Sequence, residues 1–125
     1  MSELQHWNGE AVLCLDEAGP RIASEQDALD HLIGEALGHG ASMIAVPVSR
    51  LDAAFFALRT GLAGGIAQKI TNYRLKLAVV GDISAHLQAS NALRDWVRES
   101  NKRDTVRFVP SLDDLAADAR PMPAK

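Results

Sequence analysis

The chain has 125 residues, of which 47% are hydrophobic, and a formal net charge of -3 at pH 7. This length suits one domain around one core, and the acidic balance excludes a globally basic surface of the kind that binds nucleic acid or anionic membranes. No basic and apolar leader opens the chain, no apolar run approaches a membrane span, and the single cysteine leaves no intrachain disulfide. We therefore expect a cytoplasmic protein with one domain over residues 1–125, frayed at 1–9 and 119–125.

The first predicted elements are a β-hairpin and a helix. Residues 11–15 and 21–23 flank a run of turn formers at 16–20, so they are expected to pair as two strands. Ser24 and Asp27 then form a capping-box pattern ahead of apolar residues at helical spacing. This pattern predicts an amphipathic helix that ends near residues 38–40.

Two buried strands are expected at residues 42–48 and 75–80, where almost every position is apolar. Pro47 removes a donor, so the first of these strands either faces an open edge there or stops pairing. The spacing between them predicts a helix over residues 61–72, capped by Thr60. Gly64 and Gly65 lower its helix propensity, which predicts a close approach of the helix to the sheet.

The remaining chain reads as a loop at 82–89, a helix at 90–101 capped by Ser90, a strand at 106–109 and a final helix with a capping box at Ser111. The element order is therefore β-β-α-β-α-β-α-β-α. Strands that alternate with helices pair in parallel through right-handed crossovers. We expect an α/β fold with a mixed, mostly parallel sheet and flanking helices.

The motifs of common catalytic and cofactor sites are absent from the sequence. The glycines at 61, 64 and 65 match neither a P-loop nor a dinucleotide fingerprint, so we expect no nucleotide cofactor. His31 and Glu35 have i,i+4 spacing, which supplies two metal ligands where a site needs three or four, and an exposed helix face explains them better. Cys14 has no base beside it and is expected to be buried and inert. We therefore assign no catalytic residue, no metal and no cofactor.

Three features remain as candidate binding residues. Asp82 follows the strand at 75–80, where it could accept a hydrogen bond from a ligand or cap the loop after it. Arg59, Lys69, Arg74 and Lys76 surround Tyr73, and this group could contact an anion or form a solvated face. Thr60 and Gly61 start a helix whose free N–H groups favour negative charge.

The sequence resembles a family of small bacterial proteins known only as a domain of unknown function. The residues that carry the resemblance are Phe55-Phe56, Arg59-Thr60-Gly61-Leu62-Ala63-Gly64, Gln68-Lys69, Asn72-Tyr73, Val80-Gly81-Asp82 and Glu99-Ser100-Asn101. The element order is also similar to STAS domains, the sulfate-transporter and anti-sigma-antagonist fold. In antagonists of that group a phosphoacceptor hydroxyl precedes a Gly-Leu pair, and Thr60 stands in the analogous place, although the aspartate expected two residues earlier is Leu58. The resemblance implies a STAS-like regulatory binding module.

Two functions are carried forward. The first is a binding module that recognises a protein partner or a small anionic ligand, or that forms a homo-oligomer. Its expected binding residues are Arg59, Thr60, Gly61, Tyr73, Arg74 and Asp82. The second is a small enzyme with a cleft near Arg59, Tyr73 and Asp82. A deep pocket that joins those three residues would favour the enzyme, and a shallow surface at a helix end would favour the binding module.

Overall fold

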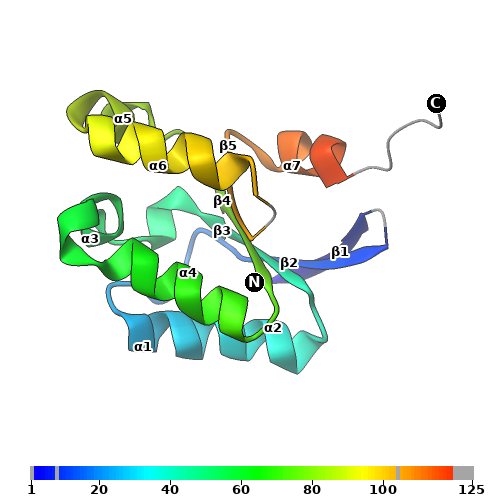
Figure 1. The fold of residues 1–125 in the computed structure, drawn as a ribbon. Coiled ribbons are helices and arrows are strands. Elements are labelled where there is room, and N and C mark those ends of the chain that lie inside the picture. The colour runs from blue at the N-terminus through cyan, green and yellow to red at the C-terminus, as the bar shows by residue number, and fades with distance from the viewer. Residues whose placement is uncertain (1, 8, 104, 120–125) are drawn as a thin grey trace.

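The computed structural model describes residues 2–7, 9–103 and 105–119. Figure 1 shows its elements, which are β1 (Glu3–Trp7), β2 (Glu10–Cys14), α1 (Glu25–Ala28), a π-helical turn (Leu29–Ile33), α2 (Gly34–His39), β3 (Met43–Pro47), a 3-10 turn (Val48–Arg50), α3 (Ala53–Phe56), a second 3-10 turn (Leu58–Thr60), α4 (Leu62–Asn72), β4 (Lys76–Val80), α5 (Ser84–Ala89), α6 (Asn91–Asn101), β5 (Val106–Val109) and α7 (Leu112–Ala119).

The strands form one mixed sheet in the order β1-β2-β3-β4-β5. β1 and β2 are antiparallel, whereas β2 with β3, β3 with β4, and β4 with β5 are parallel. The prediction that residues 42–48 and 75–80 form parallel neighbours is confirmed, since Ile44 lies opposite Leu77 and Val46 opposite Val79. The molecule is thus an α/β fold with a five-stranded sheet and flanking helices.

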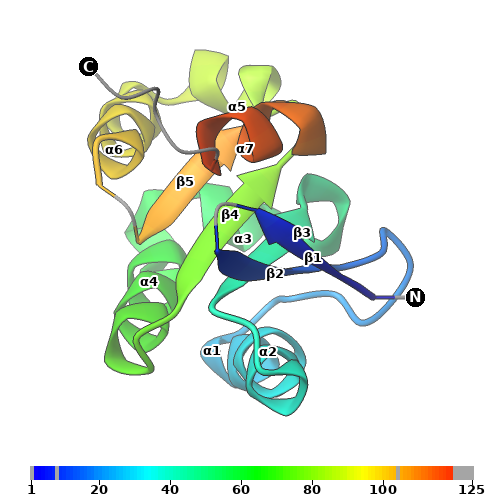
Figure 2. The same cartoon turned by 90° about the vertical axis from the view of Figure 1, so that its right-hand side faces the viewer.

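The helices divide unequally between the two faces of the sheet. α1 and α2, α3 and α4, and α5 and α6 lie on one face, and α7 lies on the other (Figures 1 and 2). This follows from the strand order, because right-handed crossovers between successive neighbours all pass over the same face. The larger core contains Leu13, Ile44, Leu77 and Phe108, and the smaller core on the α7 face is closed by Leu115.

The predicted hairpin is wrong in its choice of partner. β2 pairs with the strand before it, with Trp7 opposite Glu10, and not with residues 21–23. Of that predicted strand, only Ile22 makes an isolated bridge, to Leu51. Residues 3–7 are consequently an ordered strand and not a frayed end. Of the residues 119–125 that were also predicted to fray, Ala119 is the last residue of α7, and 120–125 lie outside the described residues.

Pro47 ends one pairing of β3 and not the other. The pairing with β2 stops at Cys14 opposite Ala45, whereas the pairing with β4 continues to Pro47 opposite Val80. The missing N–H of the proline therefore faces the side where no ladder bond is needed, as the sequence predicts.

The glycines of α4 do not bring the helix close to the sheet, so that expectation is wrong. Gly64 is exposed, and a methyl group added to it would meet nothing within 4 Å. Gly65 faces the side chain of Glu25 on α1, whose carboxylate also lies 3.8 Å from the ammonium of Lys69. Gly65 thus leaves room for a surface ion pair between two helices.

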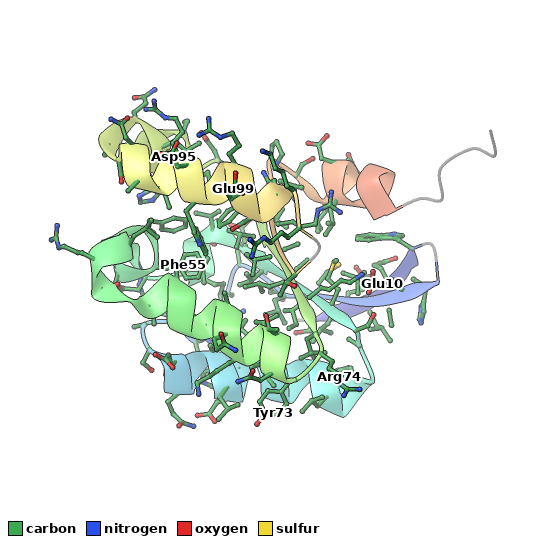
Figure 3. The ribbon with its side chains drawn as sticks, viewed as in Figure 1. Glu10, Phe55, Tyr73, Arg74, Asp95 and Glu99 are labelled. Atoms are coloured by element: carbon green, nitrogen blue, oxygen red, sulfur yellow. The ribbon has the colours of Figure 1, made fainter. Side chains whose placement is uncertain are left out.

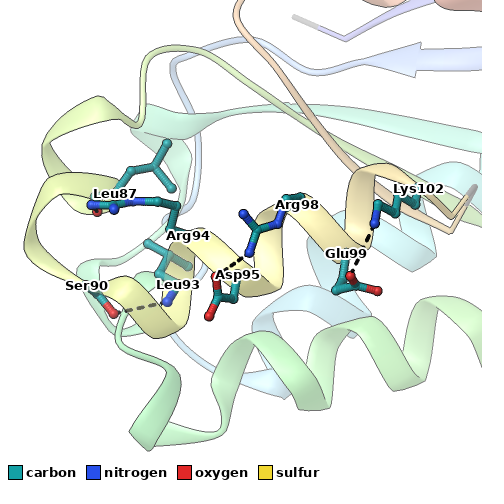
Figure 4. Close-up of polar contacts among 8 residues, drawn as sticks. All are labelled: Leu87, Ser90, Leu93, Arg94, Asp95, Arg98, Glu99 and Lys102. Carbon is teal, nitrogen blue, oxygen red and sulfur yellow. Dashed lines mark hydrogen bonds and ion pairs between the residues drawn. The ribbon is translucent and has the colours of Figure 1, made fainter.

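The last third of the chain agrees with its capping signals. The Ser90 hydroxyl accepts a hydrogen bond from Leu93 N at 3.1 Å, and exposed pairs such as Glu99–Lys102 follow along α6 (Figure 4). Ser111 caps α7 in the predicted way, since it accepts from Asp114 N. The predicted loop at 82–89 is instead mostly α5.

Candidate functional site

The carboxyl ends of the parallel strands carry several of the cavities of the described chain. At this edge β2 runs into Leu15, β3 into the turn with Arg50, β4 into Gly81-Asp82, and β5 into Pro110. Such an edge is where ligands dock in open α/β sheets. The predicted site residues therefore have to be placed relative to this edge.

Arg59, Thr60 and Gly61 lie between α3 and α4. Gly61 has φ +77, a left-handed conformation that favours glycine, and it precedes the first residue of α4. The Thr60 hydroxyl accepts from Leu62 N at 3.2 Å and lies 2.7 Å from the carbonyl oxygen of Ala54, so it links the first residue of α4 to α3. α4 begins one residue later than predicted and its N-cap residue is Gly61, so the prediction that Thr60 is the N-cap is wrong.

Tyr73 and Arg74 lie at the opposite end of α4, beside the turn into β4 (Figure 3). α4 has 11 residues, so it separates these two residues from Thr60 by about 16 Å at 1.5 Å per residue. Arg74 has φ 58, in the left-handed region, and Leu75 N donates to Ile70 O at 3.0 Å. This is the backbone arrangement that commonly ends an α-helix. The structure therefore does not bring Tyr73 and Arg74 together with Arg59.

Asp82 lines a third location, a cavity of about 320 Å³ between the ends of β4 and β5, with Leu87, Asn101 and Pro110 among its walls. Its carboxylate accepts a hydrogen bond from the N–H of Ser84, the first residue of α5, at 2.9 Å, which forms an Asx turn ahead of the helix. Hydrogen bonds from the Ser84 side chain and backbone hold the pKa of Asp82 below its ordinary value. This geometry matches the capping role that the sequence left open for Asp82.

The cavity that contains Arg59 is a groove of about 450 Å³ between α3 and the α5–α6 hairpin. We call it the Arg59 groove, and its principal lining residues are Phe56, Leu58, Arg59, His86, Ala89 and Ser90. The His86 ring stacks on Phe56, with centroids 4.1 Å apart and planes at 11°. No ion pair to Arg59 occurs among the described residues, so its exposed guanidinium is available at the rim.

Sequence reasoning missed two residues at the carboxyl edge. His86 fell in a segment read as loop, where a lone histidine gives no signal of a stacked ring. Arg50 is 6% exposed and follows β3, and its position between apolar Val48 and Leu51 was the available signal. His31 and Glu35 share a cavity with Arg50, so their helical spacing does place them on a common wall.

Other candidate chemistry is weak in the described part of the chain. No group of three or more His, Cys, Asp or Glu side chains there could hold a metal ion. Cys14 is buried, and burial, with a smaller contribution from Glu3, raises the pKa of its thiol. None of the helices within residues 2–7, 9–103 and 105–119 is long and apolar enough to cross a bilayer.

Comparison with known proteins assigns the family. A family model described as "Domain of unknown function (DUF4180)" matches residues 7–118. The chain belongs to this family. The DUF4180 match covers β2 to β5, all but the last residue of α7, the Arg59 groove and all six predicted site residues. No curated protein and no solved structure matches the chain.

Proposed function

We propose that this DUF4180 domain is a binding module whose Arg59 groove receives an acidic and apolar segment of a partner protein. The observation that carries the proposal is the guanidinium of Arg59, which has no ion pair among the described residues, at the rim of a groove with mixed polar and apolar walls, next to the stacked pair Phe56 and His86. A cation beside the partly exposed Leu58 and the exposed alanines Ala53 and Ala89 fits a segment in which a carboxylate stands near a leucine-like or aromatic side chain.

The surroundings of the groove favour a rigid docking surface. Asp52 caps α3 by accepting from Ala54 N at 3.0 Å, and Thr60 ties the end of α3 to the start of α4. On the other wall, Arg94 donates to the carbonyl of Leu87 at 3.0 Å and joins α5 to α6 (Figure 4). Walls held in this way lose little conformational entropy on binding.

The similarity of the element order to STAS domains supports the same kind of role, because those domains act as regulatory binding modules. This support is an analogy between folds and adds less than the groove itself. The alternative, a small enzyme, requires one cleft with Arg59, Tyr73 and Asp82. In the described chain these residues lie in three separate places, so we do not propose catalysis.

A native pull-down with mass spectrometry, followed by titration of the partner found, tests the proposal. Arg59→Ala is expected to weaken partner binding about tenfold, because one unpaired cation in the contact is lost. His86→Ala removes the ring stacked on Phe56 and should also weaken binding. Binding should decrease as salt is raised, since exposed charges are screened.

Arg98→Ala is the matched control. Arg98 is an exposed arginine on α6 that already pairs with Asp95, and it lies outside the groove. Thermal melts of all variants establish that they fold. Equal affinities for the parent and the Arg59→Ala and His86→Ala variants would show that the groove is not the binding surface.

A further inference from the structure

A second cavity at the carboxyl edge contains a buried arginine whose charge has no acidic partner among the described residues. This cavity, the Arg50 pocket, has a volume of about 260 Å³ and is lined by residues that include Leu15, Asp16, Gly19, His31, Glu35 and Arg50. Arg50 Nε donates to Pro20 O at 2.8 Å, and Nη1 donates to Asp16 O at 3.0 Å. Both acceptors are backbone carbonyls, so they hold the guanidinium in place without neutralising it.

Part of the guanidinium remains open to the pocket. Nη2 of Arg50 forms no hydrogen bond with the described residues. Every fully buried side-chain nitrogen or oxygen of the described residues has a hydrogen-bond partner. Because Nη2 has none, it is not fully buried and solvent reaches it. Gly19 packs against the other side, where an added methyl group would lie 2.8 Å from Cζ. The arginine is therefore fixed by its loop and presents an unused donor to the cavity.

The α1–α2 segment of the lining supplies a negative charge. Glu35 and His31 are one helical turn apart on the α1–α2 segment and both line the pocket. The Glu35 carboxylate forms no ion pair or hydrogen bond within the described chain, and none joins it to Arg50. The pocket thus has an unpaired cation on one wall and an unpaired carboxylate on another.

We propose that the Arg50 pocket binds a small zwitterion of the amino-acid class, with its carboxylate on Arg50 and its ammonium group on Glu35. Arginine is the side chain best suited to a carboxylate, because its planar fork donates two parallel hydrogen bonds. A ligand with one charge would satisfy one wall and leave the other unpaired. The volume is below the roughly 300–1,000 Å³ of pockets for drug-sized ligands, which matches a molecule of amino-acid size.

Titration of the full-length protein by NMR, with the His31 imidazole as the reporter, tests the proposal. The probes are glycine, β-alanine and γ-aminobutyrate, in which the two charged groups are increasingly far apart, together with acetate and ethylamine as single-charge controls. At least one amino acid is expected to shift the His31 resonance saturably and to bind at least about tenfold more tightly than acetate or ethylamine.

Glu35→Gln removes the ammonium partner from an exposed position and should weaken that binding about tenfold. Glu99→Gln removes the same charge from α6, far along the chain and outside the pocket, and should leave the affinity unchanged. Arg50→Lys keeps the charge but loses the fork, and should weaken binding by more than tenfold. If that variant does not fold, Glu35→Gln still decides the question.

Three results would overturn the proposal. These are saturable binding by none of the three amino acids, acetate binding as tight as the best amino acid, or unchanged affinity in Glu35→Gln. Arg59→Ala should leave amino-acid binding intact, since Arg59 lines a different cavity. Failure of the Arg50 pocket and failure of the Arg59 groove are therefore separately measurable.

Discussion

Replacing Val79 with aspartate tests the placement of β4 in the centre of the sheet. Val79 is 1% exposed, lies between Val46 of β3 and Phe108 of β5, and belongs to the larger core. Loss of the buried valine costs about 1.5–3 kcal/mol. An unpartnered carboxyl group in its place costs roughly 2–7 kcal/mol more. The combined loss approaches the entire unfolding free energy of an ordinary domain, about 5–15 kcal/mol.

Val80→Asp is the matched control, because it places the same group one residue later on the opposite face. Val80 is half-buried and borders a cavity at the end of the strand, so its substitution should cost about 1 kcal/mol. Thermal melts followed by circular dichroism measure both variants. At about 4 °C per kcal/mol, Val79→Asp should melt at least about 15 °C below the parent and Val80→Asp within about 5 °C. A Val79→Asp melt close to the parent, or equal damage from both variants, would refute the assigned strand and register.

Three further predictions concern α4, Asp82 and Cys14. Gly64→Ala should raise the unfolding free energy by about 0.5–1 kcal/mol in urea titrations, because the position is helical and has open space around it. Gly65→Ala should raise it by less, because the Glu25 carboxylate of α1 must move to make room for the methyl group. Equal gains in the two variants would contradict this prediction. Asp82→Ala should be less stable than the parent at neutral pH. Because the pKa of Asp82 is lower in the folded protein than in the unfolded chain, the carboxylate stabilises the fold fully at pH values above its unfolded pKa. The difference in stability between the parent and Asp82→Ala should therefore vanish as the pH falls through the folded pKa. A stability difference that does not change with pH in acid melts would exclude the capping role of Asp82. The Cys14 thiol should react with iodoacetamide much more slowly in the folded protein than in urea, because it is buried with a raised pKa, and equal rates would show that it is accessible.

The sequence predicted those elements whose signals are local. β3 and β4 are continuous apolar runs, and α6 and α7 each begin at a serine that caps its own helix, so no distant contact was needed to locate them. The hairpin depended on a choice between two partners for β2. The turn formers after β2 favoured residues 21–23, but Asn8-Gly9 before it is a pair typical of two-residue hairpin turns, and Trp7 pairs with Glu10 across that dipeptide.

The candidate site was harder to predict because nearness in sequence is a poor guide along a helix. Arg59 and Tyr73 are separated by the whole of α4, so the segment that connects them keeps them apart. Arg50 was missed for the opposite reason. The loop that holds its guanidinium lies 34 and 30 positions earlier in the chain, at Asp16 and Pro20 respectively. Such a pairing, across the α1–α2 helical segment and β3, leaves no periodic or local pattern.

The order in which the strands lie in the sheet also has a consequence for how the chain folds. Every strand is hydrogen-bonded to the strand that precedes it in sequence, so the sheet can grow one neighbour at a time as the chain leaves the ribosome. Each added β-α unit pairs with an edge that already exists, and it closes a smaller loop than a pairing between strands further apart in sequence would, which limits the entropic cost of the step. α7 contributes the last contacts, when Leu115 covers the face that no crossover helix reaches. Until then the α7 face of the nascent sheet remains uncovered, which makes completion of the C-terminal helix the step that ends its exposure to other unfolded chains.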